Sequence, residues 1–387
     1  MKFAESMSRL GTETAFKVLA KAKGLEAEGK HVIHLEIGEP DFDTPLNIRE
    51  AAVKALMDGE THYSPAAGLP ALRKTIARTA SEIRGIEFDP KEVVVTPGAK
   101  PIMFFSLFAL INSGDEVMYP NPGFPIYESI INFIGAKAVP YPLREEKEFS
   151  FDIEEFKSLI TDKTKLIVLN SPQNPTGGIL SKEDLEAVAD IAKEKDIIIL
   201  TDEVYLKIIY EGQHHSIAVL PGMKERTIIL DGFSKTYAMT GWRLGFGIMP
   251  EELAKRVEQL QINSNSCTCT FSQYGAIEAL AGPQHEVDNM VAEFKKRRDV
   301  IVDGLNAIDG ISCLKPHGAF YVFPNITELG IDGEKFADLL LAQYGVAALS
   351  GTAFGKYGAG YLRLSYANSV ENIQEALKRI EKAVSEL

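Results

Sequence analysis

Short apolar runs alternate with amphipathic segments along most of this chain, and this alternation restricts the fold more than any other feature. The runs are apolar at consecutive positions, which is typical of strands buried on both faces of a mostly parallel sheet. The sequence therefore predicts an α/β fold with helices flanking the sheet. The expected strands are 92–96, 116–119, 166–169, 197–200 and 227–230.

The amphipathic segments predict a long series of helices. Ser181-Lys-Glu-Asp184 has the pattern of a helix start. A chain of 387 residues exceeds one average domain, so two packed lobes are expected. The expected helices are 14–29, 47–58, 70–84, 101–113, 152–160, 181–195, 251–262, 286–308, 334–344 and 370–386.

Charge and cysteine content exclude several classes of function. Lys plus Arg is 41 and Asp plus Glu is 54, so the net charge is −13, which disfavours nucleic acid and anionic membranes as partners. Ile102–Ile111 is the longest strongly apolar run and is too short to span a bilayer. Three cysteines suit a reducing compartment, so we expect a cytoplasmic protein. Cys267-Thr-Cys269 lacks zinc-site spacing, and no metal is expected.

The residues just past the predicted strands carry most of the chemistry. In open α/β sheets, ligands bind beyond the carboxyl ends of the strands. Chemically active side chains follow every one of the predicted strands, which predicts a single site at this edge. These segments are Gly98–Lys100, Asn121–Phe124, Asn170–Gly177, Asp202–Tyr205 and Ser234–Lys235.

The segment Asp231-Gly-Phe-Ser-Lys235-Thr-Tyr-Ala-Met-Thr-Gly-Trp-Arg243 is the most specific of them. A lysine past a strand end can form a Schiff base with a carbonyl cofactor, and a nearby arginine can hold a phosphate. Pyridoxal phosphate carries both groups. The segment resembles the lysine-bearing motif of the pyridoxal-phosphate-dependent aspartate aminotransferase family, class I/II and fold type I. We expect burial beside Arg243 to lower the pKa of Lys235.

The resemblance implies a phosphate site at the start of a helix. Gly98, Ala99 and Lys100 correspond to the turn that holds the phosphate, together with Ser234 and Arg243. Some bacterial members have a lysine at the position of Lys100 that reaches a substrate's distal carboxylate. Many relatives have serine where this chain has Gly232, so one phosphate contact is expected to be missing.

The resemblance also assigns the residues around the cofactor ring. Phe124 is expected to stack on the ring, where aspartate aminotransferases typically have tryptophan. Asn174 and Tyr205 are expected to contact the phenolic oxygen, and Asn174 and Phe124 are also expected to contact the substrate, Asn174 at the substrate carboxylate. Asp202 is expected to pair with the pyridine nitrogen, with Glu203 as the competing acid. A carboxylate there makes the ring an electron sink, and Lys235 is expected to shuttle the substrate proton.

Segments far from the lysine complete the resemblance. Gly38 and Arg363 match residues that bind the substrate carboxylate, and a guanidinium fork suits that planar group. Tyr63 matches a tyrosine that reaches the neighbouring subunit's phosphate, which implies a homodimer with shared active sites. The polar stretch 263–270 is expected near the partner's site as well. His214-His215 is predicted to be a solvated loop, and Trp242 is predicted to serve packing.

The resemblance implies a large cofactor-binding domain at 48–285 and a smaller α+β domain of 1–47 plus 286–387. The implied reaction is transamination, a transferase reaction of amino-acid metabolism from an L-amino acid to a 2-oxo acid such as 2-oxoglutarate. A C–S lyase or synthase on the same fold is the alternative. A cofactor-sensing regulatory module is disfavoured because the chain has no room for a DNA-binding domain. The amino acid donor stays open, since Phe16 and Lys17 differ from the aspartate-type pattern.

Overall fold

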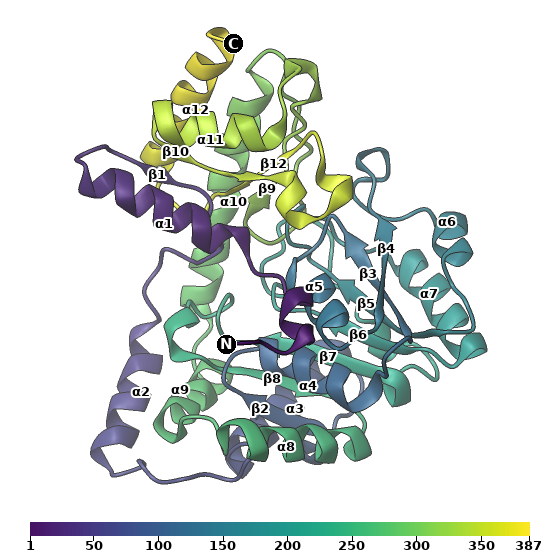
Figure 1. The fold of residues 1–387 in the computed structure, drawn as a ribbon. Coiled ribbons are helices and arrows are strands. Elements are labelled where there is room, and N and C mark those ends of the chain that lie inside the picture. Colours follow the sequence, from purple (N-terminus) through teal and green to yellow (C-terminus); the bar gives the residue numbers. More distant parts are fainter.

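A seven-stranded sheet lies at the centre of the structure and confirms the predicted α/β fold (Figure 1). The computed structural model describes residues 1–387. The strand order is β2-β8-β7-β6-β5-β3-β4, and only β8 runs antiparallel to its neighbours. The strands are β2 (Val93–Thr96), β3 (Glu116–Asn121), β4 (Lys137–Pro142), β5 (Thr164–Asn170), β6 (Ile198–Asp202), β7 (Thr227–Gly232) and β8 (Gly245–Ile248).

Both faces of this sheet are buried, as the consecutive apolar positions predict. Successive residues of β5 point to opposite faces: Leu166 and Val168 pack in one apolar cluster, while Ile167 and Leu169 pack in another. The first cluster includes residues of α4 (Lys100–Leu110), α5 (Ile126–Phe133) and α8 (Glu251–Asn265), and the second includes residues of α6 (Ile153–Ser158) and α7 (Lys182–Lys195). The sheet is therefore sandwiched between two helical layers, and only its strand ends are free to form a site.

Two strands of the sheet were not predicted from the sequence. β4 contains Pro140 and Pro142 and lies at the edge of the sheet, so its apolar pattern is weak. β8 reads Gly-Phe-Gly-Ile, and glycine is uncommon in strands. A Cβ atom at Gly245 would overlap the backbone of Gly98 and Ala99, so close approach to the turn after β2 requires this glycine.

The helices around the sheet follow most of the predictions. Ser181 caps α7 by accepting a hydrogen bond from Asp184 N, so the predicted helix start is confirmed. α5 and α9 were not predicted, and α9 buries small and polar residues on several sides instead of one apolar stripe. These helices are α2 (Leu46–Met57), α3 (Pro70–Arg84), α4 (Lys100–Leu110), α5 (Ile126–Phe133), α6 (Ile153–Ser158), α7 (Lys182–Lys195), α8 (Glu251–Asn265) and α9 (Thr270–Ala281). Together with the seven-stranded sheet they form what we call the large lobe.

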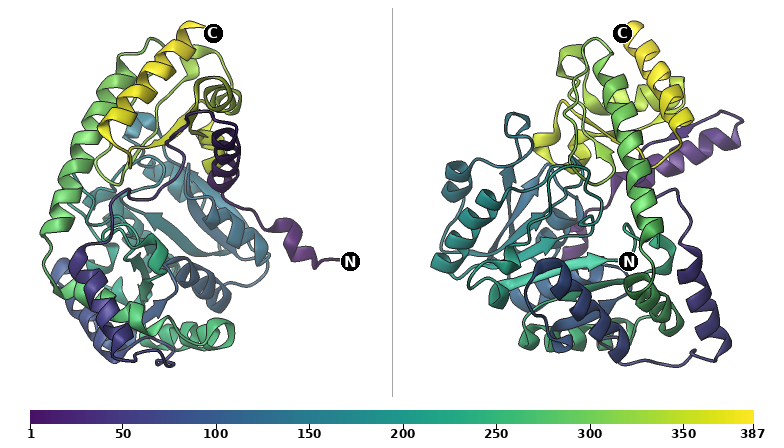
Figure 2. Two further views of the ribbon diagram at one scale, coloured as in Figure 1. Left: turned by 90° about the vertical axis from the view of Figure 1, so that its left-hand side faces the viewer. Right: turned by 180° about the vertical axis from the view of Figure 1, so that it is seen from behind.

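A small lobe is built from both ends of the chain. Its helices are α1 (Thr14–Ala27), α10 (His285–Asn306), α11 (Gly333–Tyr344) and α12 (Val370–Ser385). Its strands are β1 (Ile33–His34), β9 (Tyr321–Val322), β10 (Val346–Ala347), β11 (Leu349–Ser350) and β12 (Leu362–Ser365), where β1 pairs with β10 and the other three form an antiparallel sheet. Phe294, Phe320 and Phe336 are fully buried in its core. Figure 2 shows α10 running from the large lobe into the small one.

We propose that the domain boundaries follow these lobes, with 48–285 around the large sheet and 1–47 plus 286–387 in the smaller unit. The boundary after residue 285 falls at the start of α10. The loops also contain short 3-10 helices, which are η1 (Glu5–Arg9), η2 (Pro90–Glu92), η3 (Glu145–Lys147), η4 (Ile217–Val219), η5 (Lys224–Arg226), η6 (Thr240–Trp242), η7 (Thr327–Leu329), η8 (Gly351–Phe354) and η9 (Lys356–Gly358). None of the helices combines the length and the apolar content needed to cross a bilayer.

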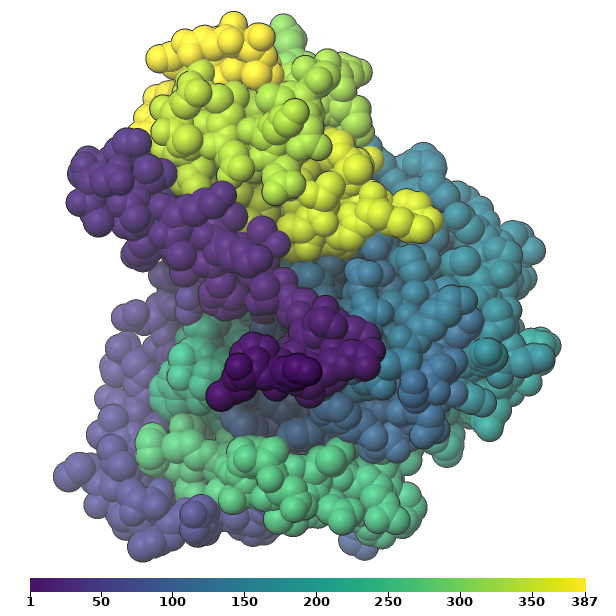
Figure 3. Space-filling view, viewed as in Figure 1, coloured from purple at the N-terminus to yellow at the C-terminus, as the bar shows by residue number.

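The N-terminal segment passes from the small lobe across to the large lobe. Arg9 Nε donates to Asn132 O at 2.9 Å, and Ser129 Oγ donates to Gly11 O at 3.2 Å, so η1 is attached to α5. The residues after it enter α1 in the small lobe. Figure 3 shows this segment in front of the hollow between the two lobes. The segment therefore forms part of the wall of any site in that hollow.

Candidate active site

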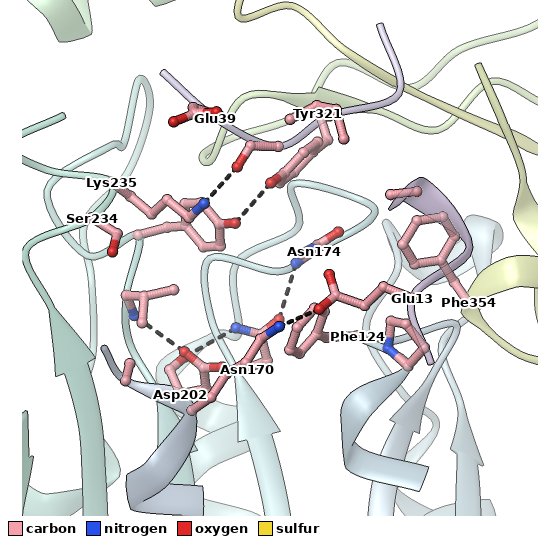
Figure 4. A pocket seen from close by; sticks show the side chains of 18 of the residues that line it. Glu13, Glu39, Phe124, Asn170, Asn174, Asp202, Ser234, Lys235, Tyr321 and Phe354 are labelled. Atoms are coloured by element: carbon pink, nitrogen blue, oxygen red, sulfur yellow. Dashed lines mark hydrogen bonds and ion pairs between the residues drawn. The ribbon is translucent and has the colours of Figure 1, made fainter. Parts of the chain in front are cut away.

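A cavity of about 500 Å³ lies between the lobes at the carboxyl edge of the sheet (Figure 4). Parallel strands that end at one edge bring their following residues together, which is why one site collects side chains from distant segments. Most of the residues predicted from the sequence line it. These are Gly38, Ala99, Lys100, Phe124, Asn174, Asp202, Tyr205, Ser234, Lys235, Arg243 and Arg363.

One end of the cavity is built to receive an anion. Ala99 precedes α4, whose first N–H groups have no partner within the helix. Gly98 lies behind Ala99, with φ of +86°, and a Cβ atom there would overlap the Arg243 guanidinium. Arg243 Nη1 donates to Thr240 O at 2.8 Å, which fixes the guanidinium beside the helix start. With Ser234 nearby in the cavity wall, this end offers several donors to a phosphate-sized anion.

Asp202 marks another part of the cavity, at the end of β6. Its side chain is buried and accepts a hydrogen bond from Tyr127 OH at 2.6 Å and from Val204 N at 3.3 Å. Burial raises the pKa of Asp202 to about 6, although these two hydrogen bonds act in the opposite direction. A positively charged ligand nitrogen beside the carboxylate would offset the cost of its burial.

The competing acid, Glu203, points away from the cavity. Arg84 Nη2 lies 2.6 Å from Glu203 Oε2, and Ser216 Oγ donates to Glu203 Oε1 at 2.7 Å. His214 Nε2 lies 3.0 Å from Glu203 Oε2, and the His214 side chain is only 9% exposed. The prediction of a solvated loop is therefore wrong for His214, because the buried Glu203 carboxylate draws the imidazole inward. Trp242 Nε1 donates to Thr44 Oγ1 at 3.0 Å, in keeping with a packing role.

Lys235 reaches the cavity from the loop after β7. Its Nζ donates to Gly38 O, which comes from the small lobe, and lies 5.9 Å from the centroid of the Phe320 ring. Burial lowers the pKa of Lys235 to about 8. The positive charges of Arg363 and Lys100 act in the same direction, while Glu39 and Glu13 oppose them. The expected lowering is thus present, and burial is its main cause.

Arg363 enters the cavity from β12 of the small lobe. Its guanidinium carbon lies 4.6 Å from the Tyr321 ring centroid and 5.0 Å from that of Phe354. The guanidinium donates to Glu36 O and, at 3.5 Å, to Asn174 Oδ1. The Nε of Arg363 is buried without a hydrogen-bond partner. A buried donor of this kind costs free energy until an acceptor arrives, so the site is prepared for an anionic ligand.

Several residues of the cavity were not singled out from the sequence. They include Glu13, Glu39, Tyr127, Tyr321 and Phe354. Tyr321 OH shares a 2.8 Å hydrogen bond with Tyr205 OH. Tyr127 follows Phe124 by three residues, so predicting α5 would have placed it at the site. Glu13 precedes α1 in no recognisable motif, and only the packing of the N-terminal segment reveals it.

Two predicted residues do not line the cavity of a single chain. Gly98 lies behind it, against Arg243. Tyr63 belongs to the large lobe and its side chain is 88% exposed. A shallow depression beside it is lined by His62, Tyr63 and residues 267–271, and Thr270 Oγ1 donates to His62 O at 2.7 Å. Phe16 and Lys17, which differ from the aspartate-type pattern, lie in the first turn of α1; Phe16 lines the cavity and Lys17 does not.

The donor set fits pyridoxal phosphate. Arg243, Ser234 and the start of α4 suit the phosphate, the buried Asp202 carboxylate suits a protonated ring nitrogen, and Lys235 supplies an amine. The Phe124 ring forms part of the wall and packs edge-on to Tyr127 at 5.7 Å between centroids. The unpartnered Arg363 donor leaves a place for a carboxylate in the same cavity.

Comparison with known proteins agrees with this fit. Residues 30–380 match the family described as aminotransferase class I and II. The chain is 44% identical over 372 residues to the aspartate aminotransferase of Pyrococcus abyssi, covering 95% of each chain. It is 40% identical over 390 residues to the aromatic-amino-acid aminotransferase 2 of Thermococcus litoralis, covering 100% of this chain and 99% of the relative. The structure of the Thermus thermophilus aspartate aminotransferase with maleate superposes with a TM-score of 0.95 at 35% identity, covering 99% of this chain and 100% of the other. This chain therefore belongs to the class I and II aminotransferases of fold type I and is a pyridoxal-phosphate-dependent transaminase.

Proposed function

We propose a specific division of roles among the residues of the cavity during amino-group transfer. The observation that carries it is that one cavity joins an amine of lowered pKa, a buried carboxylate and a buried guanidinium with a free donor, at Lys235, Asp202 and Arg363. These three groups match the reacting centre, the cofactor nitrogen and the substrate carboxylate of a transaminase.

The large lobe holds the cofactor in this proposal. Arg243, Ser234 and the N–H groups at Ala99 and Lys100 bind the phosphate. Asp202 pairs with the ring nitrogen, and Tyr127 and Val204 fix the orientation of that carboxylate. When bound, pyridoxal phosphate supplies an aldehyde that condenses with amines and a ring that withdraws electrons from the substrate Cα. Phe124 packs on the ring, and Asn174 and Tyr205 donate to its phenolic oxygen.

Lys235 is the base that moves the substrate proton. With a pKa of about 8, its amine is neutral in a fraction on the order of a tenth of molecules at pH 7. The neutral Nζ accepts a proton from the substrate Cα and then donates it to the cofactor carbon that receives the amino group. The hydrogen bond to Gly38 O holds Nζ near the junction of the two lobes, where the substrate Cα must lie.

The small lobe holds the substrate. Arg363 binds the α-carboxylate with its guanidinium fork, helped by Asn174, with which it already shares a contact of 3.5 Å, and by the backbone of Gly38. Because Arg363 and Gly38 belong to the small lobe while Lys235 and Asp202 belong to the large lobe, a bound carboxylate draws the lobes together. Such closure excludes water from the step in which negative charge develops at Cα.

The names of the relatives suggest two classes of amino acid donor, aspartate-like and aromatic. We propose that this enzyme uses an L-amino acid of one or both classes and a dicarboxylic 2-oxo acid, 2-oxoglutarate, as the acceptor. The visible absorbance of the purified holoenzyme, followed while single amino acids are added without an oxo acid, tests this. A donor that bleaches the yellow band, which 2-oxoglutarate then restores, establishes transfer and names the donor. A band that persists with every aspartate-like and aromatic donor would overturn this assignment of the donor.

We also propose that two copies of the chain form a cytoplasmic homodimer with shared active sites. The support is the exposed Tyr63 ring, which lies outside its own chain's cavity, and its proximity to residues 267–270. In a dimer, both segments would approach the partner's phosphate site.

Sedimentation tests the dimer. Mixing Lys235→Ala with Tyr63→Ala subunits tests the sharing, because only hybrid dimers contain one site with both residues intact and would regain one tightly held cofactor.

A further inference from the structure

One cation of the cavity has no role in the scheme above, and it is already paired within the chain. Lys100 Nζ contacts Glu13 Oε1 and lies 5.4 Å from the centroid of the Phe124 ring. Arg243 is assigned to the phosphate and Arg363 to the α-carboxylate, while Lys235 is the reacting amine. The family resemblance implies that a lysine at the position of Lys100 reaches the distal carboxylate of a substrate, so the Lys100–Glu13 pair is expected where the side chain of a substrate would extend.

The pair joins the two walls of the cavity. Lys100 is the first residue of α4 in the large lobe, whereas Glu13 is the residue before α1 in the N-terminal segment. Figure 4 shows the Glu13 carboxylate in the part of the cavity that contains the Phe124 and Phe354 rings. The walls of this part are therefore mainly aromatic. Lys100 faces the Phe124 ring, while Arg363, which is assigned to the α-carboxylate, faces the Phe354 ring.

The pair is also weak enough to exchange. The Lys100 side chain is 44% exposed and that of Glu13 is 18% exposed, so water screens the attraction between them. An incoming carboxylate would replace one partly hydrated carboxylate with another at the same ammonium. Such an exchange changes the free energy little, in contrast to breaking a fully buried pair.

We propose that Glu13 is a specificity-determining residue, whose carboxylate occupies the position at Lys100 that a dicarboxylic substrate needs for its side-chain carboxylate. A neutral or aromatic donor leaves the Lys100–Glu13 ion pair intact and packs against the aromatic wall, with no unpaired charge beside it. A dicarboxylic donor or acceptor displaces Glu13 and binds Lys100 itself. This inference rests on the proposed function, and it makes Glu13 the residue that sets the balance between the two substrate classes.

Binding of succinate to the holoenzyme tests the proposal without turnover. Succinate is an unreactive dicarboxylate, and calorimetry measures its Kd directly. Removing the competing charge with Glu13→Gln should lower the succinate Kd by about 2- to 5-fold, the range expected for a partly exposed ion pair. The KM for phenylalanine should change by less than about 2-fold, since a neutral donor does not compete with Glu13.

A double-variant cycle distinguishes competition from a general effect. Lys100→Met should raise the succinate Kd, and adding Glu13→Gln to it should have no further effect, because there is then no cation to compete for. Glu5→Gln is the matched control: Glu5 lies in the same N-terminal segment, pairs with Arg9 and has a 93% exposed side chain. Its succinate Kd should equal that of the wild type.

The outcomes separate this inference from the function on which it rests. A succinate Kd that is unchanged or higher in both Glu13→Gln and Glu13→Ala would overturn the role of Glu13, even if amino-group transfer is intact. Equal shifts for succinate and phenylalanine would also overturn it. If instead no amino acid bleaches the wild-type cofactor band, the proposed function fails. The succinate affinities of the wild type and of Glu13→Gln can still be compared by calorimetry in that case.

Discussion

Arg84 and Glu203 form an ion pair whose Nη2 and Oε2 atoms lie 2.6 Å apart, with side chains only 2% and 0% exposed. Glu203 follows Asp202 directly in the sequence, but its side chain points away from the cavity, toward Arg84 at the end of α3. Burial acts to raise the pKa of Glu203, and the charges of Arg84 and His214 outweigh it and lower that pKa. Two adjacent acids at one strand end thus have separate roles, since Asp202 faces the cavity and Glu203 is neutralised behind it.

Removal of Arg84 should strongly destabilise the fold. Arg84→Met leaves Glu203 buried without its main partner, and it also removes the cation that lies 3.8 Å from Asp231 Oδ2. Breaking a buried pair in this way typically costs about 3–5 kcal/mol. Urea unfolding followed by circular dichroism measures the loss.

An exposed ion pair provides the control for this prediction. Lys157 and Glu154 are 50% and 77% exposed, so Lys157→Met should cost less than about 1 kcal/mol. Equal losses in the free energy of unfolding for Arg84→Met and Lys157→Met would show that the buried ion pair contributes no more to stability than the exposed one.

The lowered pKa of Lys235 can be measured on cofactor-free protein. The acylation rate of the Lys235 peptide, followed by mass spectrometry over a range of pH, should rise with a midpoint near the pKa of about 8. Ordinary exposed lysines should acylate with midpoints near about 10.4. A midpoint for Lys235 that coincides with those of exposed lysines would contradict the buried, cation-flanked environment described above.

Arg363→Lys should weaken substrate binding although it keeps the positive charge. Lysine has neither the guanidinium fork nor the planar face that packs on Tyr321 and Phe354. A charge-assisted hydrogen bond contributes about 1.5–3 kcal/mol, so kcat/KM for the amino acid donor should fall roughly 10- to 100-fold. Steady-state kinetics with saturating cofactor measures this.

Arg297→Lys is the matched control. Arg297 is also in the small lobe, is 8% exposed, and its guanidinium carbon lies 4.8 Å from the Phe42 ring centroid, but it pairs with Asp41 outside the cavity. It should leave the donor KM unchanged. If both variants raise KM alike, the loss in Arg363→Lys reflects disturbance of the lobe and not a missing carboxylate contact.

The sheet and much of the cavity could be predicted because their signals are local. Consecutive apolar residues identify β5, β6 and β7, and the residues that follow them, such as Asn174, Asp202 and Lys235, meet at one edge by the geometry of parallel strands. The functional roles given to these residues came from a family resemblance and remain predictions until variants test them.

The parts of the fold and of the site that were not predicted depend on contacts between distant segments. β8 has no strand signal because its glycines serve close packing, Gly245 against the turn at Ala99 and Gly247 against Ile102 of α4. Glu13 and Tyr321 reach the cavity from the N-terminal segment and from β9 of the small lobe, and no spacing in the sequence shows that either meets Lys100 or Tyr205. His214 was predicted to lie in a solvated loop because no sequence pattern links it to Glu203. In the structure, His214 Nε2 lies 3.0 Å from Glu203 Oε2.

His34 should make the stability of the fold depend on pH. Its Nδ1 lies 2.8 Å from Glu36 Oε1 and its Nε2 lies 3.1 Å from Glu26 Oε1. Burial acts to lower the pKa of His34, but the two carboxylates outweigh it and raise the pKa above 6.5. The stabilising contribution is therefore complete below the unfolded pKa near 6.5 and is lost as the pH rises through the folded pKa.

The wild type should accordingly lose more thermal stability than His34→Gln as the pH is raised from about 6 to about 8.5, because only the wild type releases the bound proton. Thermal unfolding midpoints across this range measure the difference. His285 is 68% exposed and pairs only with Glu286, so His285→Gln should follow the wild-type curve. Parallel curves for the wild type and His34→Gln would show that the imidazole is not charged in the folded protein, and that Glu36 and Glu26 do not hold a proton on it.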